Sequence, residues 1–145
     1  MIFAREQFFD AIEEVEQPPC YNEAPMELYN WSAIEEETLN PLISRRVIHT
    51  ERMTICRIRL KKGAVVPMHS HENEQVTMLE SGTLLFIFEN EEKIIHAGDA
   101  LPIPPHAPHR VEALEDSLAV DLFTPVREDW RRGDDAYLRQ SVTNS

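Results

Sequence analysis

The chain has 145 residues and a formal net charge of −12, which comes from 26 acidic and 14 basic residues. Because this charge repels polyanions, neither a nucleic acid nor an anionic membrane surface is expected as a partner. Cys20 and Cys56 form no CxxC pair and are too few for a disulfide framework, which is typical of a reducing compartment. With no signal-peptide pattern and no long apolar run, we expect a single cytoplasmic domain.

The first part of the chain has helical patterns. Apolar residues recur at helical spacing from Phe8 to Val15, which predicts a short amphipathic helix. A capping-box pattern begins at Ser32 and predicts a second brief helix that leads to Asn40. We therefore interpret residues 1–44 as a helical and loop extension that packs on the rest of the protein.

From residue 45 onward the pattern becomes that of strands. Apolar and polar residues alternate from Ile55 to Leu60, as in a half-buried strand. Further candidate strands cover residues 74–79, 83–88, 93–96, 100–104, 109–113 and 118–123. A parallel α/β sheet is excluded because no crossover helix follows a strand. The sequence predicts an all-β sandwich or small barrel over residues 45–125, and then a tail, residues 126–145, with a short helix on the outside.

The pair His69-x-His71 is the strongest chemical signal in the chain. On an extended strand, residues i, i+2 and i+6 project to the same face, so Gln75 would join the two histidines there. Glu74 has the opposite parity and should point away. A proline-rich loop leads to His109, which we expect as the fourth ligand of a metal ion.

A second group of polar residues follows in the last candidate strand. Asp121 and Phe123 alternate with the apolar residues of that strand, so they face either solvent or the interior of the barrel. An interior carboxylate needs a partner, which could be a metal ion or Arg127. In that setting Asp121 would be a suitable general acid or base.

These motifs resemble the two conserved motifs of the cupin superfamily. The matching pattern is Gly63-x5-His69-x-His71-x3-Gln75-x6-Gly82, followed by Gly98-x5-Pro104-x4-His109. The resemblance implies a jelly roll, a double-sheet barrel whose mouth can hold a ligand site, with short helical extensions at both ends.

Cupins usually supply three histidines and one glutamate as metal ligands, whereas this chain has Gln75 in the fourth place. A neutral carboxamide leaves a divalent ion its full charge, which makes the ion a stronger Lewis acid. Iron(II) oxygenases more often use two histidines and a carboxylate, so oxygen chemistry loses support. The ligands do not select among zinc, nickel, iron and manganese.

The tail Asp-x-Phe-x-Pro-x-Arg-x-Asp resembles that of the small cupins of pectin breakdown, which linearise unsaturated uronate sugars. The resemblance implies that Asp121, Phe123 and Arg127 line the pocket beside the metal. A guanidinium suits a uronate carboxylate, although Arg127 could instead form an exposed salt bridge. Because small cupins commonly dimerise, the resemblance also implies a homodimer.

Three functions are compatible with these features. The leading hypothesis is a metal-dependent enzyme of the lyase or isomerase type that opens or isomerises a small acidic sugar, an anionic substrate whose carboxylate Arg127 would hold. The same pocket would also suit a binding or sensing module that does not turn its ligand over. The third alternative is a cupin dioxygenase, which would require iron and oxygen.

Overall fold

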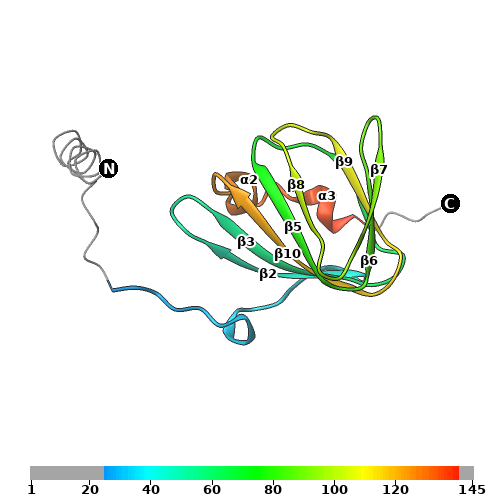
Figure 1. Cartoon of the computed structure of the whole chain (residues 1–145). Helices are drawn as coiled ribbons and strands as arrows, with labels where there is room; N and C mark the ends of the chain where they lie inside the picture. Colours follow the sequence, from blue (N-terminus) through cyan, green and yellow to red (C-terminus); the bar gives the residue numbers. More distant parts are fainter. Residues whose placement is uncertain (1–24, 141–145) are drawn as a thin grey trace, which may run out of the picture.

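The computed structural model describes residues 25–140, so the predicted helix from Phe8 to Val15 lies outside the described residues. The described part begins with a 3-10 turn and ends with two short helices (Figure 1). The elements in chain order are η1 (Trp31–Ala33), β1 (Glu37–Asn40), β2 (Ile43–His49), β3 (Thr54–Leu60), β4 (Val65–His69), β5 (Glu74–Ser81), β6 (Thr83–Ile87), β7 (Glu92–His96), β8 (Ala100–Ile103), β9 (His109–Ala113), β10 (Ser117–Thr124), α2 (Glu128–Arg131) and α3 (Ala136–Arg139). Within residues 25–140, none of the helices is long and apolar enough to cross a membrane.

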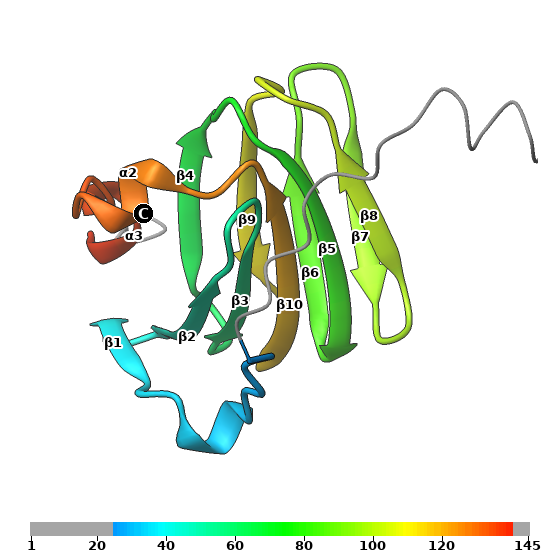
Figure 2. The same cartoon turned by 90° about the vertical axis from the view of Figure 1, so that its left-hand side faces the viewer.

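The strands form two antiparallel sheets that face each other (Figure 2). One sheet has the order β1-β2-β3-β10-β5-β8, and the other has the order β4-β9-β6-β7. Strand β10 lies between β3 and β5, both of which come much earlier in the chain, and pairs with both of them. This arrangement brings residues from both ends of the barrel sequence to one interior, and it confirms the predicted all-β, double-sheet architecture.

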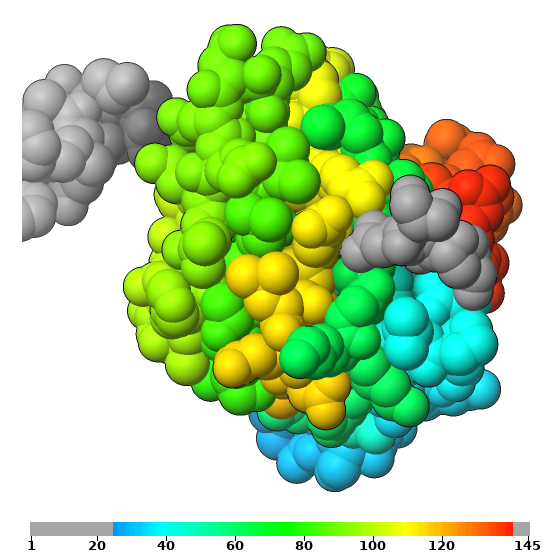
Figure 3. Space-filling model, turned by 90° about the vertical axis from the view of Figure 1, so that its right-hand side faces the viewer, coloured from blue at the N-terminus to red at the C-terminus, as the bar shows by residue number. Residues whose placement is uncertain are grey.

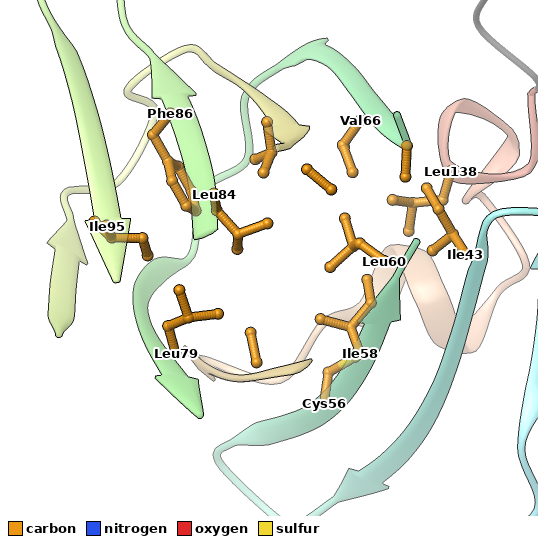
Figure 4. Packing of buried hydrophobic residues seen from close by; sticks show 14 of the residues in the cluster. Ile43, Cys56, Ile58, Leu60, Val66, Leu79, Leu84, Phe86, Ile95 and Leu138 are labelled. Carbon is orange, nitrogen blue, oxygen red and sulfur yellow. The ribbon is translucent and has the colours of Figure 1, made fainter. Parts of the chain in front are cut away.

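Alternating residues of the strands build the core between the sheets (Figure 4). In β3, Cys56, Ile58 and Leu60 are buried and their neighbours are more exposed, as the alternation predicts. Leu84 and Phe86 of β6 enter the same core from the opposite sheet. Full burial of each large apolar side chain contributes roughly 1.5–3 kcal/mol, so these inward faces fix the register of the strands.

The predicted helix from Ser32 to Asn40 is wrong. The 3-10 turn η1 spans three residues and is capped by the Asn30 side chain, and the chain is extended at Ile34. Residues Glu37–Asn40 form β1, which pairs with β2. The local capping pattern was therefore overridden by pairing with a neighbouring strand. Both β1 and the start of β2 lie within the predicted extension 1–44, and the division of the chain after residues 44 and 125 stays a prediction.

The C-terminal helix was predicted near Asp134 to Leu138, and α3 occupies Ala136–Arg139. It was expected on the outside, but Leu138 is 4% exposed and belongs to the core cluster. In the space-filling view the red C-terminal helix lies beside the cyan β1 (Figure 3), and α3 contacts both β1 and β4. The tail is therefore part of the wall of the barrel.

Candidate functional site

Three histidines converge at one end of the barrel, although they do not come from a single strand. His69 is the last residue of β4, His71 lies in the turn that leads to β5, and His109 is the first residue of β9. The condition that the segment from His69 to Gln75 is extended is not met, because the chain turns between β4 and β5. The register of β4 and β9 places His69 directly opposite His109, and the turn returns His71 to the same place.

Backbone carbonyls fix the orientation of the three imidazole rings. Nδ1 of His69 donates to the carbonyl of Pro67 at 2.7 Å, and Nδ1 of His109 donates to the carbonyl of Ala107 at 2.8 Å. Nδ1 of His71 lies 3.0 Å from the carbonyl of Asn73. One ligand nitrogen from each histidine lies within 4.8 Å of the other two. A ring that donates through Nδ1 presents the Nε2 lone pair to a metal ion, so the cluster has the orientation expected of ligands.

The three histidines are held in the neutral form that metal binding requires. Burial lowers the pKa of His69 to about 3, with a further contribution from the charge that His109 would carry. Burial lowers the pKa of His71 to about 4, and the charge of Arg127 adds to the effect. Burial also lowers the pKa of His109. At neutral pH the cluster therefore offers lone pairs without first losing protons.

Gln75 completes the cluster through its side-chain oxygen. Gln75 is 5% exposed, and its Oε1 lies 3.0 Å from Nε2 of His71. A neutral imidazole carries one proton, but both nitrogens of His71 face oxygen acceptors, Oε1 of Gln75 and the carbonyl of Asn73. In one of the two contacts the lone pair of a His71 nitrogen therefore faces the lone pair of an oxygen. A cation between that nitrogen and that oxygen would remove the repulsion. The residues fit a metal ion on this ground.

A chain of hydrogen bonds fixes the Gln75 amide and extends to a carboxylate. The Gln75 Nε2 group donates to Oγ1 of Thr77 at 2.9 Å, and the Thr77 hydroxyl donates to Oδ1 of Asp121 at 2.6 Å. Because the hydroxyl proton is used on Asp121, Thr77 must accept from the amide nitrogen, which leaves Oε1 of Gln75 directed toward His71. Glu74 is exposed, as its opposite parity predicts.

Asp121 lies on the interior face of β10 together with Phe123, which is 2% exposed. Burial raises the pKa of Asp121 to about 6, and the hydrogen bonds from Thr77 and Gln75 and the charge of Arg127 partly oppose the rise. A carboxyl group with this pKa is populated in both protonation states near neutral pH. It can therefore accept or donate a proton at little cost.

Arg127 is buried, with 1% of its surface exposed, and it borders the same cavity. Nε and Nη2 donate to the two carboxylate oxygens of Asp129 at 3.0 and 2.7 Å. Burial acts to lower the pKa of Arg127, but the hydrogen bond and charge of Asp129 and Tyr137 outweigh it and raise the pKa. The guanidinium also lies 4.7 Å from the ring centre of Phe123. The alternative prediction, an exposed salt bridge of Arg127, is therefore correct about the ion pair with Asp129 but wrong about its exposure.

The structure adds residues that the sequence did not single out. Thr77 follows Gln75 by two positions and shares its face, so strand alternation could have identified it. Trp130 and Tyr137 also line the cavity, and they come from the C-terminal tail. The Tyr137 ring centre lies 4.7 Å from that of His69. No local pattern in the sequence predicts that α3 would reach the histidines.

This fold and this cluster define a cupin, and the chain belongs to the cupin superfamily. The cupin domain family matches residues 56–124. The predicted cupin jelly roll is therefore confirmed, with few and short helices outside the sheets.

Within this superfamily the chain is similar to pectin-degradation cupins. It is 31% identical over 98 residues to the pectin degradation protein KdgF of Dickeya dadantii (strain 3937). The aligned region covers 65% of this chain and 88% of that protein. The structure of KdgF from Halomonas sp. matches with 31% identity and a TM-score of 0.67 over 72% of this chain and 99% of that chain. An RmlC-like cupin from Shewanella frigidimarina matches with 24% identity and a TM-score of 0.68 over 73% of this chain and 96% of the other, which bears on the fold alone.

Proposed function

We propose that this cupin is a metal-dependent enzyme that opens the ring of a small unsaturated uronate sugar. The observation that carries the proposal is the hydrogen-bonded path from Asp121 through Thr77 to Gln75, which joins a carboxyl group with a pKa of about 6 to the three-histidine cluster. The similarity to two KdgF proteins, one of which is named for pectin degradation, supports a sugar acid as the substrate class.

His69, His71, His109 and Gln75 would hold the metal ion. The chemistry of these ligands suits zinc, nickel, iron and manganese alike. A divalent ion with these neutral ligands would supply Lewis acidity toward a substrate oxygen. The absence of a carboxylate from the ligand set favours this chemistry over that of the iron(II) oxygenases.

The ring opening of an unsaturated uronate is a net isomerisation. The anomeric hydroxyl loses its proton, the bond between the anomeric carbon and the ring oxygen breaks, and an aldehyde and an enol result. The enol becomes a ketone when its hydroxyl proton is lost and the neighbouring carbon of the former double bond is protonated. Asp121 would carry the proton between these positions, because its carboxyl group changes protonation state near neutral pH. No atom is gained or lost.

Arg127 and Phe123 would bind and orient the sugar. A guanidinium is suited to the uronate carboxylate, and the buried Phe123 ring packs against both Arg127 and His71. The chain carries a net charge of −12, so a positive group inside the pocket is needed to attract an anionic substrate.

The ring opening removes the conjugated double bond, so the loss of ultraviolet absorbance measures the reaction. We expect metal-loaded protein to accelerate the loss, and Asp121→Asn to reduce the rate by roughly 10²–10⁴-fold while it keeps its metal. Asp134→Asn, an exposed change, should leave the rate unaltered. An unchanged absorbance with metal-loaded protein would contradict the reaction. Tight uronate binding without turnover, equal in Asp121→Asn, would instead support the binding module.

The predicted homodimer and the predicted cytoplasmic location belong to this proposal as well. Light scattering coupled to size exclusion tests the first, since a mass near that of one chain, 16.8 kDa, would contradict it. Fractionation of cells that express the tagged protein tests the second.

A further inference from the structure

The cavity lined by His69 and His109 is too small for the substrate that the chemistry favours. Its volume is about 40 Å³, and Trp130, Tyr137 and Leu138 of the C-terminal segment are among the residues that line it. One water molecule needs roughly 10–15 Å³ of such space, whereas pockets for small organic ligands span roughly 300–1,000 Å³. The cavity can therefore hold an ion with its water but not a sugar ring.

The C-terminal residues also engage the groups that the substrate would use. Asp129 binds Nε and Nη2 of Arg127 through both carboxylate oxygens, as a uronate carboxylate would. The hydroxyl of Tyr137 accepts hydrogen bonds from Nη2 of Arg127 at 2.9 Å and from Nε1 of Trp130 at 3.3 Å. The Tyr137 ring packs against His69. Substrate and tail thus compete for the same positions.

A few polar contacts hold the tail in place. Asp135, which is 2% exposed, accepts hydrogen bonds from Arg45 of β2 at 2.5 Å and from Arg139 at 3.0 Å. Asn40 of β1 donates to the carbonyl of Leu138 at 3.1 Å. The Arg45 guanidinium lies over the Trp130 ring at 4.4 Å.

Few apolar side chains support these contacts. Helix α2 has no buried residue and Leu138 is the buried residue of α3, while Trp130 and Tyr137 pack against the core only partly buried. Segments that bury few apolar side chains open at low cost compared with core strands. The tail is also outside the residues that match the cupin domain family, which end at Thr124.

We propose that residues 128–140 form a lid that closes the metal site through Tyr137 and withdraws to admit the sugar. Asp135 is the latch of this lid, because it joins α3 to β2. The part of this proposal that concerns the sugar rests on the proposed function, whereas the part that concerns access to the histidines does not. When the open form is a minor state, the apparent dissociation constant of a ligand rises by the reciprocal of its population.

The rate of metal release tests the lid without any sugar. Full-length protein is loaded with zinc and mixed with excess chelator. We expect Asp135→Asn to release zinc roughly tenfold faster, since it weakens charge-assisted hydrogen bonds of the latch. Asp134→Asn is the matched control, because Asp134 is exposed and pairs with Arg132 rather than with the barrel. Its release rate should equal that of the parent.

Tyr137→Phe serves as the second variant, since it retains the ring and removes the hydroxyl that Arg127 and Trp130 contact. It keeps the test decisive if Asp135→Asn fails to fold. Trp130 reports on the lid directly in a Trp31→Phe background, where it is the one remaining tryptophan of the two in the chain. Opening should shift its emission to longer wavelength in the latch variant. Release rates and emission equal to those of the parent in both folded variants would overturn the lid.

The Michaelis constant for the uronate separates the lid from the proposed reaction. Asp135→Asn should have a lower Michaelis constant than the parent, because in this variant a larger fraction of the protein has an open lid. If zinc release accelerates in the variants and neither they nor the parent consumes the uronate, the lid is supported and the proposed reaction is contradicted. If the uronate is consumed while zinc release and tryptophan emission do not change, the reaction is supported and the lid is contradicted.

Discussion

The Thr77 hydroxyl donates a hydrogen bond of 2.6 Å to the Asp121 carboxylate, and the same oxygen accepts from Gln75. Thr77 is therefore the link between the carboxyl group that would move protons and the amide that would bind the metal. It is 1% exposed, so neither bond can be replaced by bulk water.

Replacing Thr77 by valine should move the pH dependence of activity to higher pH. The hydrogen bond from Thr77 lowers the pKa of Asp121, so its loss lets burial raise that pKa further. At neutral pH we expect activity to fall roughly tenfold, the effect of losing one hydrogen bond to a charged group. The measurement is the rate of ultraviolet absorbance loss against pH. Thr124→Val, an exposed change at the end of β10, is the control, and an identical profile for both variants would argue against the link.

Asp121 should also make the protein less stable as the pH rises. Its pKa is about 6 in the folded protein against an ordinary value of 3.8, so between these values the folded state keeps a proton that the unfolded state has lost. The free energy of unfolding therefore falls across this window, by at most about 1.4 kcal/mol per pH unit.

Asp121→Asn cannot titrate, so its stability relative to the parent should be greater near pH 7 than near pH 4.5. Urea unfolding of metal-free protein at the two pH values measures the difference. The lowered pKa values of His69 and His71 act in the opposite direction, because unfolded imidazoles take up protons first as the pH falls. That effect is common to both proteins and cancels. If the difference in the free energy of unfolding between the two proteins is the same at both pH values, the pKa of Asp121 is not raised in the folded state.

Two glycines of the cupin motif should differ in their tolerance of alanine. Gly82 and Gly98 both have positive φ angles, +91° and +94°, so alanine is strained at either position. At Gly82 the added methyl group would also clash with the Asp116 carbonyl and with Ser117, whereas Gly98 faces open space. We expect Gly98→Ala to cost about 1 kcal/mol and Gly82→Ala to cost roughly 1–3 kcal/mol more. Urea midpoints measure both, and equal costs would contradict the clash.

The barrel strands were predictable because their burial follows a period of two. The buried residues of β3 follow directly from alternation. On β10, alternation places Asp121 and Phe123 on one face but leaves open whether that face meets solvent or the interior, and in the structure Phe123 is buried. The predicted helix from Ser32 to Asn40 failed because pairing of β1 with β2, which is not a local property, decided the conformation. The extended conformation assumed from His69 to Gln75 failed for a related reason, because no periodic pattern marks the turn after His69, although His71 still joins the cluster.

The resemblance implied that Arg127 lines the pocket, but residue spacing does not predict how the C-terminal wall of the site is held in place. Tyr137 reaches His69 because Asp135 pairs with Arg45, which is 90 positions away in the sequence. Arg127 is buried because Asp129 neutralises it and Trp130 covers it at 4.3 Å. These placements depend on tertiary contacts between side chains, and residue spacing carries no information about them.

Gln75→Glu tests whether the neutral carboxamide of Gln75 binds the metal ion and how its lack of charge affects zinc affinity and the rate of ring opening. A carboxylate at this position should tighten zinc binding about fivefold or more, because a full charge beside a divalent ion contributes at least about 1 kcal/mol even in water. The same charge should slow ring opening, since it weakens the Lewis acid and raises the pKa of the nearby Asp121. Calorimetric zinc titration and the absorbance assay measure the two effects. Glu74→Gln is the matched control, because Glu74 is the exposed neighbour on the opposite face of β5. If Gln75→Glu binds zinc as the parent does while His69→Ala loses it, Gln75 is not a ligand and its amide serves only to hold Thr77.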